Sequence, residues 1–99
     1  MRDHTREALH LVRDKSREDL DADRLLNLGL VRLLEIVGEA ASRVPDLDRE
    51  KYPTIPWSEI VGLRNRLIHG YDQVDFDILW QILRNDLPKL AEELDRLLP

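Results

Sequence analysis

The sequence predicts an all-α fold, an up-and-down bundle of four to five helices that assembles as a homodimer. Apolar residues recur three and four positions apart through most of the chain, which is the periodicity of amphipathic helices. Prolines fall between these apolar runs, and no stretch alternates apolar and polar residues as a strand does. With 99 residues, of which 42% are hydrophobic, we expect a single domain over residues 1–99 with a modest core.

A first helix is expected over residues 2–15. Its apolar residues are Ala8, Leu9, Leu11 and Val12. Ser16 and Asp19 then follow at the spacing of a capping box, in which each side chain accepts a hydrogen bond from the backbone N–H group of the other residue. We therefore expect a short turn that begins at Ser16.

A second helix is expected over residues 22–44 and ends before Pro45, which cannot continue a helix. One apolar stripe along it consists of Leu26, Leu30, Leu33, Val37 and Ala41. Further apolar positions on its other sides are Leu25, Leu28, Leu34 and Ile36. A helix that is apolar on more than one side must be covered on more than one side. In a chain of this size the expected cover is a second subunit, which is the reason for predicting a homodimer.

A polar connection follows over residues 45–56, with room for a helical turn around residues 47–51. The third helix is then expected to start near Ser58 as its N-cap, or with Pro56 in its first turn. Gly70 is a good C-terminal stop for this third helix, because glycine readily adopts the left-handed conformation that ends a helix.

The last third of the chain predicts two more helices. A fourth helix runs from residue 74 or 75 to about residue 85. A fifth follows Asp86-Leu87-Pro88, because proline is tolerated in the first turn of a helix.

Composition excludes several classes of protein. The chain has no cysteine, so disulfides and thiolate metal sites are ruled out. No apolar run approaches the roughly 20 residues that span a bilayer, and the start lacks the apolar stretch of a signal peptide, so a cytoplasmic location is expected by default. A formal net charge of −5 argues against a general nucleic-acid coat.

The distribution of charge is more informative than its total. Residues 60–71 contain Arg64 and Arg66 and no acidic residue, a local charge of +2. Residues 72–99 contain three basic and seven acidic residues, a local charge of −4. A small cationic region on an acidic molecule suits the binding of one or two phosphates better than the tracking of a long duplex.

The cationic region contains the octapeptide Arg-Asn-Arg-Leu-Ile-His-Gly-Tyr over residues 64–71. Arg64 is a permanent cation whose donors match two phosphate oxygens at once. His69 can exchange a proton near neutral pH, and Tyr71 offers a phenolic hydroxyl. Cleavage of RNA without a metal needs a base, an acid and a cation for the charged phosphorane, so Arg64 and His69 cover two of the three roles. A dimer whose motif helices face each other would bring two copies of both into one cleft.

Helix geometry raises an objection to this pairing. On an ideal helix, five residues place Arg64 and His69 roughly 140° apart around the axis and about 7.5 Å apart along it. Convergence requires the helix to unwind near Gly70, the arginine to reach around, or a partner chain to supply one member.

The pattern Arg-x4-His-x-Tyr resembles the HEPN superfamily, and most closely its HepT-like branch of small toxins. Further segments that carry the resemblance are Ile55-Pro56-Trp57, Asp86-Leu87-Pro88 and Glu35-Ile-Val-Gly-Glu-Ala-Ala41. The resemblance implies a HEPN-like bundle and a metal-independent endoribonuclease toxin without a cofactor, in which Arg64 and His69 are catalytic and Asn65 is a supporting residue.

The resemblance also implies a partner. In a HEPN/MNT type toxin–antitoxin system, a minimal nucleotidyltransferase of the MntA type would transfer AMP to the motif tyrosine, here Tyr71. The alternative is a non-catalytic nucleotide- or protein-binding HEPN module that regulates such a partner. A third interpretation is a structural bundle whose acidic face docks a basic partner.

Other residues are expected to have structural roles. His4 and His10 lack a third ligand at helical spacing and are interpreted as solvated. Core or interface positions are expected for Trp57 and Trp80.

Two sets of acidic residues have separate interpretations. Glu35 and Glu39 are assigned a structural or interface role, in which Glu39 pairs with Arg43, although one of these acids could orient Arg64. A cluster of aspartates follows the motif, interpreted as helix capping with metal binding left open. Its members are Asp72, Asp75 and Asp77.

Overall fold

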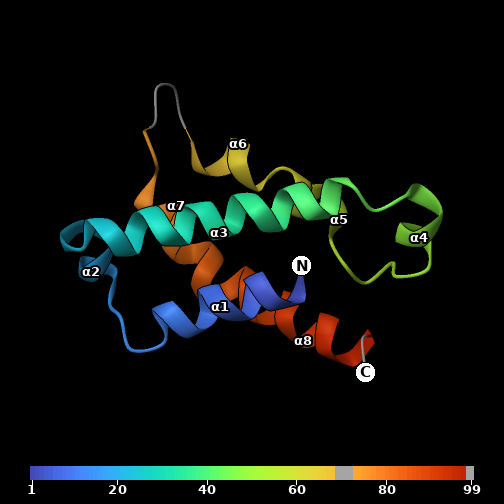
Figure 1. Cartoon of the computed structure of the whole chain (residues 1–99), viewed down its shortest axis with the longest axis horizontal. Coiled ribbons are helices and arrows are strands. Elements are labelled where there is room, and N and C mark those ends of the chain that lie inside the picture. Colours follow the sequence, from blue (N-terminus) through green and yellow to red (C-terminus); the bar gives the residue numbers. More distant parts are fainter. Residues whose placement is uncertain (69–72, 98–99) are drawn as a thin grey trace.

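The computed structural model describes residues 1–68 and 73–97 and shows the all-α bundle that the sequence predicts (Figure 1). The helices within these ranges are α1 (Arg2–Val12), α2 (Arg17–Ala22), α3 (Arg24–Ser42), α4 (Asp46–Glu50), α5 (Trp57–Val61), α6 (Leu63–Leu67), α7 (Phe76–Gln81), the π-helix η1 (Ile82–Asp86) and α8 (Leu87–Leu97). The long α3 crosses the middle of the molecule. α1 packs against α3 and α8, while α5 and α6 pack against α3 from its other side.

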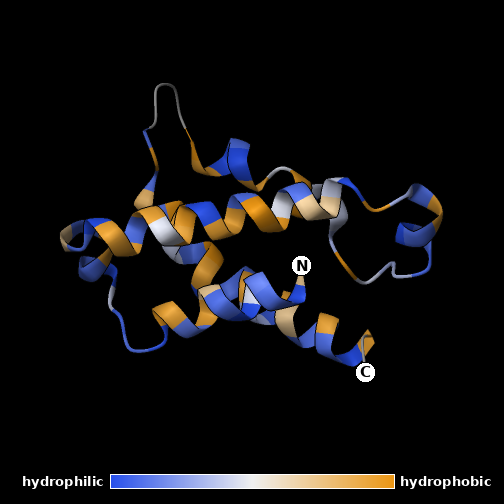
Figure 2. Cartoon of the chain, viewed as in Figure 1, coloured by the Kyte–Doolittle hydropathy of each residue, from blue (hydrophilic) through white to orange (hydrophobic). Residues whose placement is uncertain are grey.

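The core surrounds α3. Leu30, Leu34 and Val37 of α3 are fully buried, and so are Leu79 and Ile82 from the C-terminal helices. Apolar residues run along most of α3 (Figure 2). Burial of each such side chain contributes about 1.5–3 kcal/mol to folding, so α3 organises the bundle.

None of the helices in the described ranges combines the length and the apolar character needed to cross a membrane.

The predicted capping box is confirmed at the start of α2. The backbone N–H group of Ser16 donates to the carboxylate of Asp19 at 2.7 Å, and this hydrogen bond lowers the pKa of Asp19. α1 ends at Val12 rather than at residue 15, and the box begins a six-residue helix rather than a short turn. The capping box was therefore predicted correctly, but the length of the element that it starts was predicted too short.

α3 is shorter than the predicted helix over residues 22–44 because Asp23 interrupts the chain before it. Asp23 has an extended backbone, and its side chain accepts a hydrogen bond from the N–H group of Leu26 at 3.1 Å. The buried Asn27 donates to the carbonyl of Leu20 at 2.8 Å and so ties α3 to α2. A separate α2 therefore precedes α3.

Arg49 organises the connection that follows α3. Its guanidinium donates to the carbonyls of Val44 and Ala41, both at 3.0 Å. Carbonyls at the end of a helix lack a full set of partners within the helix, so Arg49 supplies donors to them. The indole N–H group of Trp57 donates to the Arg49 carbonyl at 3.2 Å. The helical turn predicted around residues 47–51 is confirmed as α4.

The third helix was predicted as a single helix from Ser58 to Gly70, and this prediction was wrong. The helix begins at Trp57 after Pro56, and Gly62 (φ −83°, ψ 3°) separates α5 from α6. α6 then ends at Leu67, before Gly70, which lies outside the described residues.

Pairing with the following segment ends α6. Ile68 is extended (φ −105°, ψ 118°) and forms an antiparallel β-bridge with Val74. The N–H group of Asp75 donates to the carbonyl of Leu67 at 2.9 Å. These contacts give the backbone at the end of α6 hydrogen-bond partners outside the helix. Local propensity does not predict such partners.

The predicted fifth helix is confirmed as α8, which begins at Leu87 with Pro88 in its first turn. The predicted boundary between the fourth and fifth helices was wrong, because α7, η1 and α8 form one continuous helical segment. Pro88 has no N–H group and its ring crowds the carbonyl four residues earlier, that of Arg84. The π-helix accommodates this by widening the turn, and Leu87 donates to the carbonyl of Ile82, five residues earlier. A proline that usually ends a helix is thus absorbed within one.

Candidate functional site

The motif arginine faces α3. The Nε atom of Arg64 on α6 lies 3.9 Å from Oε2 of Glu35, and Nη1 of Arg32 lies 3.7 Å from the same oxygen. The Glu35 side chain is 26% exposed, whereas those of Arg32 and Arg64 are 64% and 67% exposed. A half-buried acid therefore lies between two exposed guanidiniums. Of the two acids that the sequence singled out on this helix, Glu35 is therefore the one that lies near Arg64.

Neighbouring charged residues are paired elsewhere. Arg43 donates to Glu39 at 2.9 Å, as predicted from their spacing on α3. Arg66, the second arginine of the motif, contacts the carboxylate of Asp86 at 3.1 Å. The two arginines that give the local charge of +2 therefore lie at different places. Arg66 pairs with Asp86, and Arg64 lies against α3.

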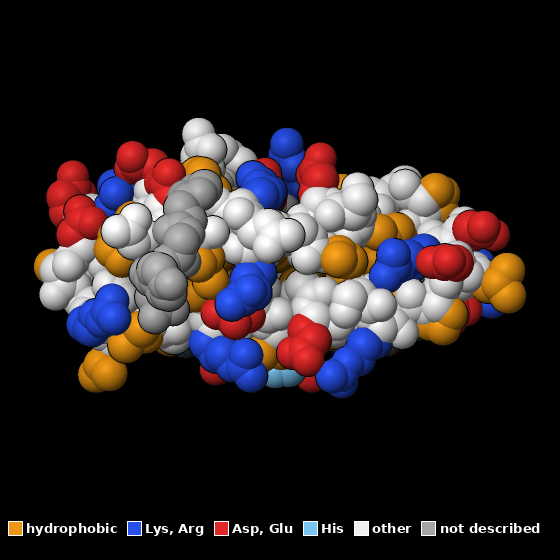
Figure 3. Space-filling view, turned by 90° about the horizontal axis from the view of Figure 1, so that it is seen from above, with side chains coloured by type: hydrophobic (Ala, Val, Ile, Leu, Met, Phe, Trp, Pro, Cys, Tyr) orange, Lys and Arg blue, Asp and Glu red, His pale blue; other side chains and the backbone are white. Residues whose placement is uncertain are grey.

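Two hollows flank Glu35 between α3 and the chain that follows Gly62. The first, of about 330 Å³, is lined by Arg32, Glu35, Gly38, Glu39, Ser42, Val61 and Arg64. The second, of about 410 Å³, is lined by Arg24, Asn27, Leu28, Val31, Arg32, Glu35, Ile68, Val74 and Phe76. Because Arg32 and Glu35 line both hollows, we treat them as one feature, the α3–α6 groove. On this face basic and acidic side chains lie next to one another over the middle of the molecule (Figure 3).

Close packing of α5 on α3 positions α6. A Cβ atom added at Gly38 would lie 2.9 Å from the carbonyl oxygen of Ile60, which is closer than real Cβ contacts allow. Gly38 thus permits the backbone of α5 to approach α3. Leu63 and Leu67 of α6 are buried, whereas Arg64 and Asn65 are exposed.

The end of α6 removes the geometric objection to the motif. The separation of 140° assumed a helix that continues through residue 69, but α6 ends at Leu67 and Ile68 is extended. His69 and Tyr71 themselves lie outside the described residues. Ile68, to which His69 is bonded, lines the α3–α6 groove.

Sequence reasoning did not select Arg24 or Arg32 as site residues. Both come from α3 and line the groove together with Arg64. The only available signal was their spacing of eight residues, which places them on one side of a helix. Arg24 and Arg32 become part of a groove only because α6 packs against this side of α3.

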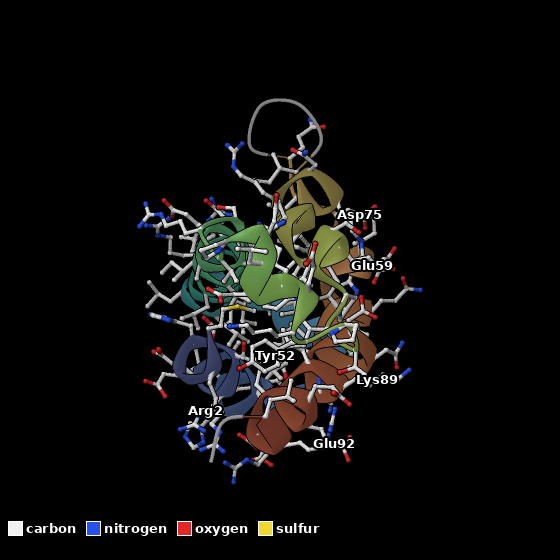
Figure 4. The ribbon with its side chains drawn as sticks, turned by 90° about the vertical axis from the view of Figure 1, so that its right-hand side faces the viewer. Arg2, Tyr52, Glu59, Asp75, Lys89 and Glu92 are labelled. Atoms are coloured by element: carbon white, nitrogen blue, oxygen red, sulfur yellow. The ribbon has the colours of Figure 1, made fainter. Side chains whose placement is uncertain are left out.

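A hollow on another side of the bundle is acidic. It has a volume of about 420 Å³, and its charged lining residues are Glu59, Asp86, Lys89, Glu92 and Glu93. Glu59, Lys89 and Glu92 lie on the side of the molecule away from α3 (Figure 4). The hydrogen bond from Arg96 lowers the pKa of Glu93, so this carboxyl stays ionised at neutral pH. Such a surface repels phosphate, and anion binding is favoured at the α3–α6 groove.

The remaining candidates have structural contacts. Asp75 caps α7 by accepting hydrogen bonds from the N–H groups of Asp77 and Ile78, which confirms the capping role. Asp77 also pairs with Arg17 at 2.9 Å. Asp72 lies outside the described residues, and the described ranges contain no group of three or more side chains placed to hold a metal ion.

His10 and the two tryptophans also have structural contacts. His10 is exposed, and its Nδ1 atom lies 2.7 Å from Nη2 of Arg13. Trp57 and Trp80 are partly buried and pack against the core, as predicted.

Comparison with known proteins identifies relatives over nearly the whole chain. The family model described as "Ribonuclease HepT-like" matches residues 1–97. A Methanocaldococcus jannaschii protein named "Putative RNase" is 36% identical, over 90% of this chain and 82% of that protein. A Caldanaerobacter subterraneus subsp. tengcongensis protein, also named "Putative RNase", is 39% identical over 88% of this chain and 78% of its own. A "Probable ribonuclease HepT" of Thermococcus cleftensis is 35% identical over 92% of this chain and 86% of that protein. No solved structure matches the chain significantly.

Proposed function

Because the chain belongs to the family of HepT-like ribonucleases, we propose that it is a metal-independent endoribonuclease and the toxin of a toxin–antitoxin pair. Arg64 and His69 are its catalytic residues, and Asn65 supports them. The observation that carries this proposal is the α3–α6 groove, in which Arg64 lies against Glu35 and Arg32 on a molecule with a net charge of −5.

The chemistry follows from the residue types. A base removes the proton of the RNA 2′-hydroxyl, whose oxygen attacks the adjacent phosphorus, and an acid protonates the 5′-oxygen that leaves. His69 serves as the base or the acid, because its ordinary pKa lies near neutral pH. Arg64 donates to the phosphoryl oxygens, whose negative charge increases in the transition state. The end of α6 at Leu67 supports this pairing, since it removes the helical constraint between the two residues.

A homodimer would complete the site. One histidine cannot be base and acid in the same step, so a second subunit would supply the missing group. Two leucines on α3 support this assembly, since Leu25 is 84% exposed and Leu28 is 48% exposed. They lie on the sides of α3 that the sequence marks as apolar beyond the core stripe. The single-domain organisation over residues 1–99 and the cytoplasmic location likewise remain predictions.

The test of the function is cleavage of a labelled RNA by the purified protein in excess EDTA. The wild type is expected to cut, and His69→Ala is expected to lose activity while keeping its helical circular dichroism. Cutting by both proteins would remove His69 from the mechanism. No cutting by either, with intact mass excluding a modification of Tyr71, would favour the alternative, a non-catalytic module that binds a nucleotide or a protein.

The partner in this proposal is a minimal nucleotidyltransferase of the MntA type that transfers AMP to Tyr71. The added group carries a phosphate, which would occupy the space near Arg64 and neutralise the cation meant for RNA. Tyr71→Phe is expected to cut RNA as the wild type does and to resist silencing by the partner with ATP. Intact mass measures the modification directly. Modification of Tyr71→Phe at another residue, with loss of cleavage, would show that Tyr71 is not the target.

A further inference from the structure

A second arginine completes the α3–α6 groove. Arg32 of α3 and Arg64 of α6 approach the same carboxylate oxygen of Glu35, at 3.7 Å and 3.9 Å. We propose that Arg32 is a second binding residue for RNA phosphate and that Glu35 is a positioning residue for both guanidiniums. This inference rests on the proposed function, because it assumes that RNA is the substrate.

The balance of charge is the first argument. Two guanidiniums share one carboxylate, which leaves a local charge of +1 at the centre of the groove. A phosphodiester carries one negative charge and would neutralise it. The two arginine–glutamate distances exceed the 2.7–3.2 Å typical of a formed N–H···O hydrogen bond, so the donors of both arginines are not saturated by Glu35. They therefore retain the capacity to bind an incoming phosphate.

Exposure is the second argument. The side chains of Arg32 and Arg64 are about two-thirds exposed, whereas that of Glu35 is about one-quarter exposed. The acid thus lies beneath the two cations and presents them to solvent. Exposed ion pairs contribute only about 0–1 kcal/mol to stability, so this arrangement does little for folding. Its consequence is that attraction to one carboxylate keeps both guanidiniums close to the groove.

Position is the third argument. Arg32 and Glu35 line both the hollow that contains Arg64 and the hollow that contains Ile68. A single RNA strand that follows the groove from Arg64 toward Ile68 must therefore pass Arg32. Other arginines near the groove differ from Arg32 in their pairing. Arg43 has its own acid, Glu39, at 2.9 Å, and Arg66 has Asp86 at 3.1 Å.

The experiment compares Arg32→Gln with the control Arg43→Gln, which removes the same charge at the C-cap of the same helix, outside the groove. KM and kcat are measured for single-stranded RNA in EDTA. Arg32→Gln is expected to raise KM about five- to tenfold and to change kcat less than about twofold, because it removes ground-state binding. Arg43→Gln is expected to change neither. Thermal melting of each variant checks that the fold is intact.

Salt dependence provides a second readout. RNA binding by each variant is measured by fluorescence anisotropy in a His69→Ala background, which prevents cutting. Loss of one phosphate contact is expected to reduce the slope of log affinity against log salt by about 0.7 for a single strand. The slope should fall for Arg32→Gln and stay constant for Arg43→Gln.

Glu35→Gln tests the positioning role. Removal of its negative charge should lower KM, whereas loss of orientation at Arg64 should lower kcat, and a merely structural role would not separate the two constants in this way. An unchanged kcat would overturn the role of Glu35. If the wild type cuts RNA and Arg32→Gln matches Arg43→Gln in both KM and salt slope, the role of Arg32 is overturned while the function stands. If the wild type neither binds nor cuts RNA, the proposed function fails and this inference fails with it.

Discussion

Replacing Arg64 with alanine is expected to lower kcat/KM for RNA by about two to three orders of magnitude. Removal of one donor that stabilises a developing oxyanion has an effect of about this size in other enzymes. Arg64 is the motif arginine that lies against α3 in the groove, and its partner Glu35 would keep it in a defined orientation. The measurement is single-turnover cleavage of a labelled RNA in EDTA, with the folded state of the variant checked by its melting curve.

Two further variants make the Arg64 result specific. Arg66→Ala removes an arginine two residues away that pairs with Asp86, and it is expected to keep cleavage within about threefold of the wild type, in line with the small contribution of exposed ion pairs. Arg64→Lys keeps the charge but not the two-pronged guanidinium, so it is expected to restore only part of the activity. Equal losses for Arg64→Ala and Arg66→Ala would mean that overall charge, rather than the position of Arg64, controls cleavage.

Replacing Gly38 with alanine is expected to lower the free energy of unfolding by about 1–3 kcal/mol, the usual range for overpacking of a filled interior. The new methyl group would lie 2.9 Å from the carbonyl oxygen of Ile60, and this backbone atom cannot move as a flexible side chain does. Relief requires α5 to shift away from α3. Because α6 follows α5 directly, Arg64 should move away from Glu35 and cleavage should fall as well.

Gly29 provides the matched control for Gly38. Both glycines lie within α3, but a Cβ atom at Gly29 would meet no heavy atom within 4 Å. Gly29→Ala is therefore expected to raise stability by up to about 1 kcal/mol through helix propensity alone. Urea unfolding of the two variants measures the difference. A similar gain for Gly38→Ala would show that α5 does not approach α3 as closely as the structure indicates.

Several elements of the fold were predictable from local patterns. The apolar stripe along residues 22–44 predicted the central helix, and Leu30, Leu33 and Val37 of this stripe are buried in α3. Ser16 and Asp19 predicted a capping box at the right place. These predictions succeeded because helix periodicity and capping depend on residues within one or two turns of each other.

The predictions that failed involve partners distant in sequence. The sequence predicts Gly70 as the helix stop, but contacts of Leu67 and Ile68 with residues 74–75 end α6 earlier. The sequence around Pro88 predicts a boundary between the fourth and fifth helices, but the π-helix over the preceding residues keeps the chain helical. Single-sequence patterns carry no information about such pairings, because tertiary contacts outweigh local propensity at element ends.

The same division applies to the candidate site. The sequence by itself determined the all-α class and the chemistry of the motif, because helical periodicity and the proton and charge properties of arginine and histidine are local. Only the tertiary structure decided that Glu35 of α3, which already lies near Arg32 on the same helix, also lies 3.9 Å from Arg64 of α6. That meeting depends on the close approach of α5 at Gly38, which joins residues more than 20 positions apart in the chain. Local propensity cannot specify it, because it arises from how complete helices pack.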